Sequence, residues 1–281
     1  MKLVSNYREN NELRKSFIQL AADIFGLDFT NWHEKGYWGE RYIPYSFADG
    51  GRVVANVSVN ELDLILNRES RKALQIGTVM THPDYRNKGL SAKLMNHVLA
   101  EYEGKYDYMY LFANDSVLDF YPKFGFERVE EYQYSTRVPS DTGRAGLRKL
   151  EVPADLKQIE KVVYGRVPVS QSFATANSGG ITMYHILNVF PDHLHYSEEE
   201  NAIVIFTEEN SQVQLYDVIS TSPVNITNLL PEGEVVFHYT PDYKGLKVHS
   251  VPFKREGTLF VKSGVGREFP RFVKHPFTSE A

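Results

Sequence analysis

One stretch decides the fold of this 281-residue chain: Leu74-Gln-Ile-Gly-Thr-Val-Met-Thr-His-Pro-Asp-Tyr-Arg-Asn-Lys-Gly-Leu-Ser-Ala-Lys-Leu-Met-Asn-His-Val-Leu99. Residues 74–81 alternate apolar and small side chains as a buried strand does, and Pro83 then ends the strand because proline has no N–H to donate. From Gly89 onward, apolar residues recur at the spacing of a helix face, namely Leu90, Leu94, Met95, Val98, Leu99 and Tyr102.

The turn between this strand and this helix has the chemistry of an anion site. A glycine at the helix start, Gly89, lets a ligand approach the backbone, where the first helical N–H groups lack partners and the helix dipole favours negative charge. Arg86 and Lys88 add positive charge, so a phosphate or pyrophosphate fits the turn. The alternative is an ordinary connection whose basic side chains are only solvated.

The turn Arg86-Asn87-Lys88-Gly89-Leu90-Ser91 resembles the acyl-coenzyme-A signature of the GNAT N-acetyltransferases, in which Arg or Gln-x-x-Gly-x-Gly or Ala follows a strand that ends near Val-x-Pro. Pro83 and Tyr85 extend the resemblance. Ser91 replaces the usual last Gly or Ala, a small departure that still allows close approach to the backbone.

A second segment carries the same resemblance. Residues 107–113 predict another buried strand, and a short helix is expected from there to Gly125. Members of the family commonly have a polar residue after this strand, then a Tyr, then a Gly-Phe pair. The residues of this chain that resemble them are Asn114, Tyr121, Gly125 and Phe126.

Composition excludes several classes of function. The formal charge of -5 is divided into -2 for residues 1–145 and -3 for the remainder, so neither half has the basic excess of a nucleic-acid binder. The chain has no Cys, which excludes disulfides, thiolate metal sites and a cysteine nucleophile. His193 and His195 would share a strand face, but no third ligand is apparent, and no metal site is predicted.

The first half predicts a mixed α/β domain over residues 1–140. Residues 11–25 have one apolar face and are followed by Gly26, which indicates a helix with a glycine stop. Residues 43–48 and 52–59 predict a hairpin across Asp49-Gly50-Gly51, and the second strand can continue to residue 66. No apolar run reaches membrane-spanning or signal-peptide length, so we expect a cytoplasmic protein without membrane contact.

A glycine-rich linker at residues 139–146 is expected to separate a second domain, residues 147–281. Its order of helices and strands is similar to that of the first half, which predicts two GNAT-like modules in tandem. Residues 219–229 contain no Arg, Lys or Gly, so the second module is expected to lack the coenzyme A turn. It is then a scaffold that completes the acceptor pocket; a second cofactor site is the alternative.

Tandem acetyltransferases with one active and one degenerate module look similar, such as the enhanced-intracellular-survival acetyltransferases. This chain is too short for their additional sterol-carrier-like domain, so their substrate class is not carried over.

The resemblance implies acetyl-coenzyme A as acyl donor and gives roles to several residues. Backbone groups of the strand end would contact the pantetheine arm and thioester, the turn would hold the pyrophosphate, and a polar residue would bond the pantetheine. These cofactor-binding candidates are Val79, Met80, Thr81, Arg86, Asn87, Lys88, Gly89, Leu90, Ser91 and Asn114. Tyr121 would be the general acid for the departing thiolate, and its alternative role is to pack its ring against the sheet.

Glu61 and Asp63 are the candidates for binding or deprotonating the amine. They lie two apart on a predicted strand and therefore face the same way. Both could equally be solvated carboxylates at a sheet edge. Glu280 and the terminal carboxylate of Ala281 are further candidates, since some tandem relatives bring this end of the chain to the active site.

An aromatic segment is the candidate acceptor-binding region, because GNAT folds place acceptor contacts there. It could line a pocket for an organic amine, or it could serve core packing; its members are Trp32, Tyr37, Trp38, Tyr42, Tyr45 and Phe47.

These observations predict an N-acetyltransferase that transfers an acetyl group from acetyl-coenzyme A to a primary amine by direct attack in a ternary complex. The acceptor would be a small molecule or a peptide, and a homo-oligomer is compatible with the chain. The alternative is a non-catalytic module that binds acyl-coenzyme A or another protein.

Overall fold

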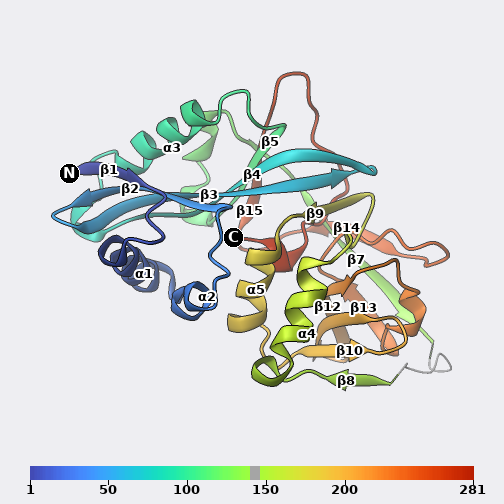
Figure 1. The fold of residues 1–281 in the computed structure, drawn as a ribbon. Helices are drawn as coiled ribbons and strands as arrows, with labels where there is room; N and C mark the ends of the chain where they lie inside the picture. Colours follow the sequence, from blue (N-terminus) through green and yellow to red (C-terminus); the bar gives the residue numbers. More distant parts are fainter. Residues whose placement is uncertain (140–145) are drawn as a thin grey trace.

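Two twisted sheets with helices packed on them make up the computed structural model, which describes residues 1–139 and 146–281 (Figure 1). The expected mixed α/β fold is confirmed. The predicted linker at 139–146 falls mostly on residues 140–145, which lie outside the described part of the chain. The helices are α1 (Asn11–Phe25), α2 (Thr30–Glu34), α3 (Leu90–Glu101), α4 (Val152–Tyr164) and α5 (Gly179–Asn188).

Local sequence signals account for the helix ends. The side chain of Asn10 accepts a hydrogen bond from the N–H of Leu13 at 3.1 Å, which caps α1, and Gly26 ends the helix in the left-handed conformation with φ 69°. The predicted helix between Asn114 and Gly125 is wrong in one respect. Two separate 3₁₀ turns, η2 (Asp115–Val117) and η3 (Tyr121–Phe124), replace it, because Pro122 cannot donate a helical hydrogen bond.

The first sheet has the strand order β1-β2-β3-β4-β5-β15-β6 in the described residues, and β9 pairs with the far end of β3. Neighbours are antiparallel except for β4 and β5, which are parallel. Helix α3 covers one face, and α1 and α2 lie against the other (Figure 1). The strands are β1 (Lys2–Ser5), β2 (Tyr42–Asp49), β3 (Arg52–Leu66), β4 (Glu69–Thr81), β5 (Tyr108–Ala113), β6 (Glu127–Arg128), β9 (Phe173–Ala176) and β15 (Thr258–Ser263).

The second sheet repeats this plan with the order β8-β10-β11-β12-β13-β7-β14. Its fourth and fifth strands, β12 and β13, are again the parallel pair. The connection between them contains the 3₁₀ turn η4 (Ile226–Asn228) where the first sheet has α3. The strands are β7 (Glu131–Val138), β8 (Leu147–Lys149), β10 (Leu194–Ser197), β11 (Ala202–Glu209), β12 (Gln212–Ser220), β13 (Gly233–Phe237) and β14 (His249–Phe253).

The two halves of the chain exchange one strand. Strand β7, from the first half, lies between β13 and β14 of the second sheet. Strand β15, from the second half, lies between β5 and β6 of the first sheet. Figure 1 shows the red end of the chain returning to the blue and green strands. A boundary drawn in the sequence near residue 140 therefore divides the chain but not the two sheets.

The cores of the two halves are also joined. A cluster of buried aromatic and aliphatic side chains runs from α1 and α2 to α4 and α5, and includes Phe17, Trp32, Trp38, Ile159 and Ile186. The ring of Phe29 lies 5.2 Å from that of Tyr184 in α5. Burial of this apolar surface holds the two halves in one arrangement.

We expect residues 1–139 expressed alone to be unfolded or aggregated, because β5 and β6 lose β15 and β7 presents an unpaired, partly apolar edge. Co-expression with residues 146–281 should restore a soluble complex, measured by co-purification and by thermal unfolding. A monomeric 1–139 fragment with a cooperative unfolding transition would contradict the reciprocal dependence of the two sheets.

Candidate functional site

Strand β4 carries a bulge that opens the sheet. Asn56 pairs with Met80 and Ser58 with Gly77, so Thr78 and Val79 oppose the single residue Val57. Thr78 has a left-handed backbone with φ 44°, as a bulge residue can. The parallel pairing of β4 with β5 ends at Ile76 opposite Leu111, although both strands continue. From Gly77 to Thr81, β4 therefore has no strand paired to this edge in the described residues, and an extended ligand with amide groups can hydrogen-bond there.

The predicted basic turn lies where this open edge ends. Asn87 (φ 61°) and Gly89 (φ 69°) both adopt the left-handed conformation, and Gly89 precedes α3 without a side-chain cap. A Cβ on Gly89 would meet no protein atom within 4 Å, so the space above it is open to a ligand. The guanidinium of Arg86 donates to the carbonyl of Thr81 at 3.4 Å, and the hydroxyls of Thr81 and Ser91 are 2.7 Å apart. Strand end, turn and helix start are thus fixed around a free helix N-terminus.

Asn114 and Tyr121 follow β5, the strand that pairs with β4. Asn114 is exposed at the end of the strand. The ring of Tyr121 is buried, with ring centroids 6.3 Å from Phe126 and 6.0 Å from Phe260. Phe260 belongs to the exchanged strand β15, so the second half of the chain supplies one wall around Tyr121. Burial raises the pKa of Tyr121 to about 12.

Glu61 and Asp63 lie on β3 and share a face, but each already has a partner. The hydroxyl of Tyr102, just after α3, donates to the Glu61 carboxylate at 3.2 Å. The Asn177 side chain donates to the Asp63 carboxylate. Desolvation raises the pKa of Tyr102 well above its ordinary range, so its phenol stays a donor to Glu61.

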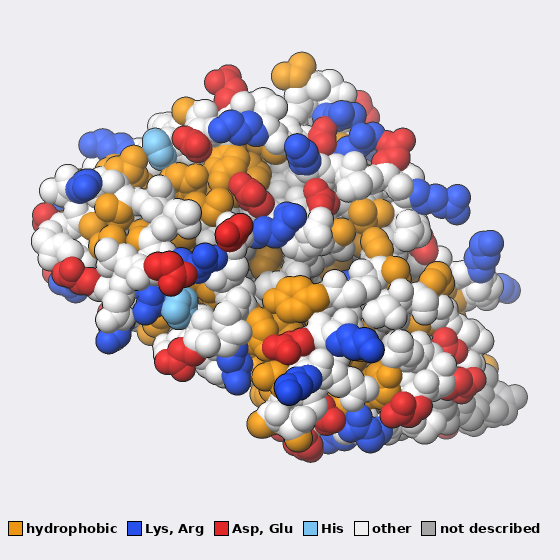
Figure 2. All heavy atoms as spheres, in the orientation of Figure 1, with side chains coloured by type: hydrophobic (Ala, Val, Ile, Leu, Met, Phe, Trp, Pro, Cys, Tyr) orange, Lys and Arg blue, Asp and Glu red, His pale blue; other side chains and the backbone are white. Residues whose placement is uncertain are grey.

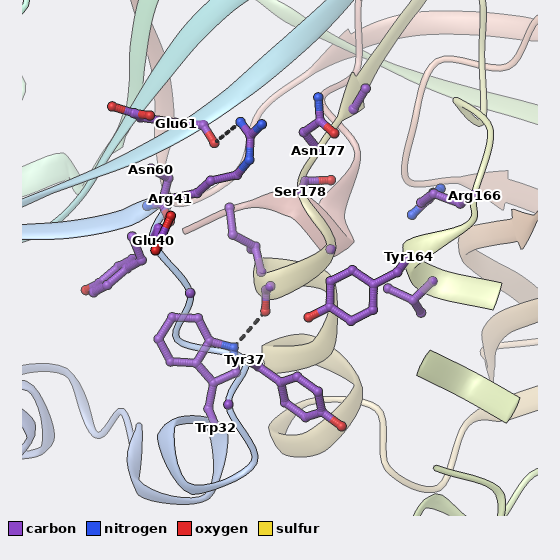
Figure 3. A pocket seen from close by; sticks show the side chains of 18 residues that line it. Trp32, Tyr37, Glu40, Arg41, Asn60, Glu61, Tyr164, Arg166, Asn177 and Ser178 are labelled. Carbon is purple, nitrogen blue, oxygen red and sulfur yellow. Dashed lines mark hydrogen bonds between the residues drawn. The ribbon is translucent and has the colours of Figure 1, made fainter. Parts of the chain in front are cut away.

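A cavity of about 540 Å³ lies on the opposite side of β3, between the α2–β2 segment of the first half and α4 and α5 of the second (Figure 3). It opens on the hollowed face between the two lobes in Figure 2, with acidic and basic side chains around it. Tyr42 connects it to the bulge, because the Tyr42 hydroxyl lies 2.9 Å from that of Thr78. Its lining includes Trp32, Tyr37, Glu40, Arg41, Tyr42, Asn60, Glu61, Tyr164, Arg166, Asn177, Ser178 and Gly180.

The aromatic segment divides between two faces of the sheet. Trp32, Tyr37 and Tyr42 line the cavity and also pack in the central cluster. Trp38 is fully buried in that cluster. Tyr45 and Phe47 pack on the α3 face, where the Tyr45 ring lies 5.6 Å from that of His97. Both of the alternatives considered for this segment, cavity lining and core packing, therefore occur.

Sequence reasoning missed the cavity residues of the second half. Strand β9 pairs with the far end of β3, with Ala176 opposite Asp63, and this brings Asn177 and Ser178 beside the first sheet. No local motif marks these positions, since their role arises only from a pairing across more than a hundred residues of chain.

The described residues contain no group of three His, Cys, Asp or Glu side chains that could hold a metal ion. His195 lies on β10, where its ring stacks 4.3 Å from Phe206. Among the residues that the structure describes, no helix is both long and apolar enough to cross a membrane.

Comparison with known families agrees with this geometry. Residues 11–129 match the model of the acetyltransferase (GNAT) domain. This part of the chain is similar to a GNAT domain. The basic turn, the open edge of β4 and Tyr121 all lie within the matched residues.

Curated relatives match part of the chain. It is 40% identical over 80 residues to N-alpha-acetyltransferase 50 of Danio rerio, covering 26% of this chain and 48% of that protein. It is 34% identical over 82 residues to the probable N-acetyltransferase san of Drosophila melanogaster, covering 27% of this chain and 45% of that one. The chain thus spans less than half the length of these relatives.

Solved structures match over both sheets. A probable N-acyltransferase from Enterococcus faecalis has a TM-score of 0.61 at 15% identity, covering 92% of this chain and 71% of that one. Eis1 from Mycobacterium abscessus has a TM-score of 0.58 at 12% identity, covering 92% and 73%. At these identities the likeness shows the fold.

We expect Arg86→Glu to weaken binding of coenzyme A at least tenfold, because it places a negative charge beside the free N-terminus of α3. Lys72→Glu is the matched control, since Lys72 is exposed at the opposite end of β4. Isothermal titration calorimetry measures both. Equal affinities of the two variants would show that the turn does not hold the diphosphate.

Proposed function

We propose that this protein is an N-acetyltransferase that transfers the acetyl group of acetyl-coenzyme A to a primary amine in a ternary complex. The observation that carries the proposal is the continuous path from the bulge at Thr78, along the unpaired edge of β4, to the basic N-terminus of α3. Such a path suits a ligand with an extended amide-bearing arm and a diphosphate.

The donor occupies this path. Backbone groups of Val79, Met80 and Thr81 pair with the pantetheine arm, and Asn114 reaches it from the end of β5. The turn from Arg86 to Ser91 holds the pyrophosphate with its backbone N–H groups and the Arg86 and Lys88 charges. One donor site per chain follows, because the equivalent connection in the second sheet, residues 221–232, has no Lys or Arg and only the 3₁₀ turn η4 in place of an α-helix.

The acceptor enters from the cavity on the other side of β3. Its neutral amine attacks the thioester carbon, a C–N bond forms, and the C–S bond of the thioester breaks. The proton lost by the amine and the proton gained by the departing thiolate balance the reaction. With no Cys in the chain, no cysteine acyl-enzyme is available, which favours direct attack.

The second half of the chain, residues 147–281, is proposed to be a degenerate GNAT-like module that completes the acceptor cavity. Its sheet has the strand order and orientations of the first sheet, with the parallel pair in the same place. Residues of α4, α5 and the segment before α5 form one wall of the cavity.

Tyr121 is the proposed general acid. We expect Tyr121→Phe to lower kcat by about 10²-fold or more, because the thiolate would leave without a proton donor. Since burial raises the pKa of Tyr121 to about 12, the phenol is protonated throughout the neutral range, and kcat should show no decline due to Tyr121 below about pH 11.

Tyr132→Phe, at a partly exposed position on β7, is the control, and free thiol release is the measurement. Unchanged turnover in Tyr121→Phe would remove the assignment. If no amine in a broad panel releases thiol while coenzyme A still binds, the chain is instead a non-catalytic acyl-coenzyme-A-binding module.

Glu61 is the proposed base, because its backbone borders the cavity and Tyr102 fixes its carboxylate through a hydrogen bond. Glu61→Gln should lower kcat/KM at least tenfold at neutral pH, with recovery at higher pH as more of the amine becomes neutral. Asp63→Asn should change kcat/KM less than threefold, because the Asp63 carboxylate is held by Asn177. Equal effects of the two substitutions, measured by thiol release across pH, would refute the role of Glu61.

A further inference from the structure

The cavity wall in the second half is the N-terminus of a helix. In the described residues the first hydrogen bond of α5 joins the Thr182 N–H to the Ser178 carbonyl at 3.0 Å, so the amides of Gly179, Gly180 and Ile181 have no acceptor within the helix. The Ser178 side chain does not cap them. These donors and the helix dipole favour a negative group in the cavity.

A second, independent donor faces the same cavity. Glu61 bonds to Tyr102 on the α3 side of the sheet, and successive strand residues point to opposite faces, so Asn60 projects toward the cavity that it lines. Asn60 is 3% exposed, and its Nδ2 has no hydrogen-bond partner among the described residues. A buried donor left unpaired is unfavourable, and an acceptor group on a ligand would satisfy it.

The charged side chains around the cavity also favour a negative ligand, because the acidic groups are paired or exposed while two arginines keep unused charge or donors. The carboxylates of Glu61 and Glu160 accept hydrogen bonds from Tyr102 and Tyr37, and Glu40 is exposed at the rim. The guanidinium of Arg41 is exposed and is held at 3.3 Å by the backbone carbonyl of Glu61, which leaves its charge available. Arg166 is held by Asp217 through two bonds of 2.8 Å, and its buried Nε has no partner in the described chain.

The N-terminus of α5, with its unpaired N–H groups, is held rigidly against the first half of the chain. The indole of Trp32 donates to the Gly180 carbonyl at 2.7 Å. A Cβ on Gly180 would stand 2.9 Å from the Tyr37 carbonyl oxygen, so only glycine allows this approach. Rigid donors lower the cost of ordering the site when a ligand binds.

Resting on the proposed function, we propose that the acceptor is an amine that also carries a carboxylate, as an amino acid does, with the carboxylate bound between the N-terminus of α5 and Asn60. Its amine lies toward Tyr42, whose hydroxyl reaches the bulge at Thr78. A volume of about 540 Å³ accommodates a molecule of this size.

Matched acceptor pairs test the proposal. L-phenylalanine is compared with phenethylamine, and L-lysine with cadaverine, by thiol release with acetyl-coenzyme A. We expect kcat/KM to be at least tenfold higher for the carboxylate-bearing member of each pair. Glycyl-L-phenylalanine and L-phenylalanine amide distinguish a free amino acid from a peptide as the source of the carboxylate. Low kcat/KM for both compounds indicates a free amino acid, and low kcat/KM for the amide alone indicates a peptide carboxylate.

Variants locate the carboxylate. Asn60→Leu removes the hydrogen-bond donor at similar side-chain volume, and Arg41→Gln removes the exposed charge. Each should reduce the preference for the carboxylate-bearing acceptor at least threefold, with the affinity for coenzyme A unchanged. Asn96→Leu is the control, because Asn96 is exposed on α3 and does not line the cavity. Arg41→Gln changes an exposed side chain, so it provides the test should Asn60→Leu not fold.

Two outcomes overturn the proposal: equal use of both members of each pair, or a preference that survives in both variants. If no acceptor leads to release of thiol from acetyl-coenzyme A, the proposed function fails. Calorimetry with the coenzyme-A-bound protein then tests the carboxylate site independently of turnover. A tenfold tighter Kd for L-phenylalanine than for phenethylamine supports it, and equal Kd values refute it.

Discussion

The antiparallel ladder between β5 and β15 is the interaction on which the rest of the structure depends. It runs from Thr258 opposite Ala113 to Ser263 opposite Tyr108, and it fills a position that the first half of the chain leaves to the second. The reciprocal ladder of β7 with β13 fixes the other half in return. Because the two exchanges are mutual, neither sheet can be completed unless both halves are present, and the cavity between them has a defined shape.

The segment after β15 reinforces this arrangement with buried polar contacts. Lys274 is fully buried and pairs with Glu131 on β7 at 3.2 Å, while Arg255 pairs with both Glu131 and Glu280. Such a network stabilises little in itself, but removing one member would leave a buried charge unpaired, at a cost of about 3–5 kcal/mol. It therefore specifies the path of the segment, which ends with Ala281 beside Gly77 at the bulge of β4.

In the proposed reaction, the acyl donor and the acceptor approach the bulge of β4 from opposite sides. On one side the chain offers unpaired backbone and a basic helix N-terminus, which suits a donor with a diphosphate. The other side has a cavity with hydrogen-bond donors from both halves. Tyr121 lies near the first of these sides, walled by Phe260 from the exchanged strand, so the second half contributes to the surroundings of the proposed acid as well as to the acceptor cavity.

The sequence by itself determined the local features: α1 with its Gly26 stop, the hairpin at Gly50-Gly51, and the strand, basic turn and helix from Leu74 to Leu99. Each of these depends on periodicity, caps and turns, which act over a few residues. Only the tertiary structure decided the strand exchange, the pairing of β9 with β3, and the donor wall of Asn60 and α5. These contacts join residues a hundred or more positions apart, and β-pairing partners leave no mark in the spacing of either strand. For the same reason Glu61 and Asp63 could be placed on one face from the sequence, while their partners Tyr102 and Asn177 could not.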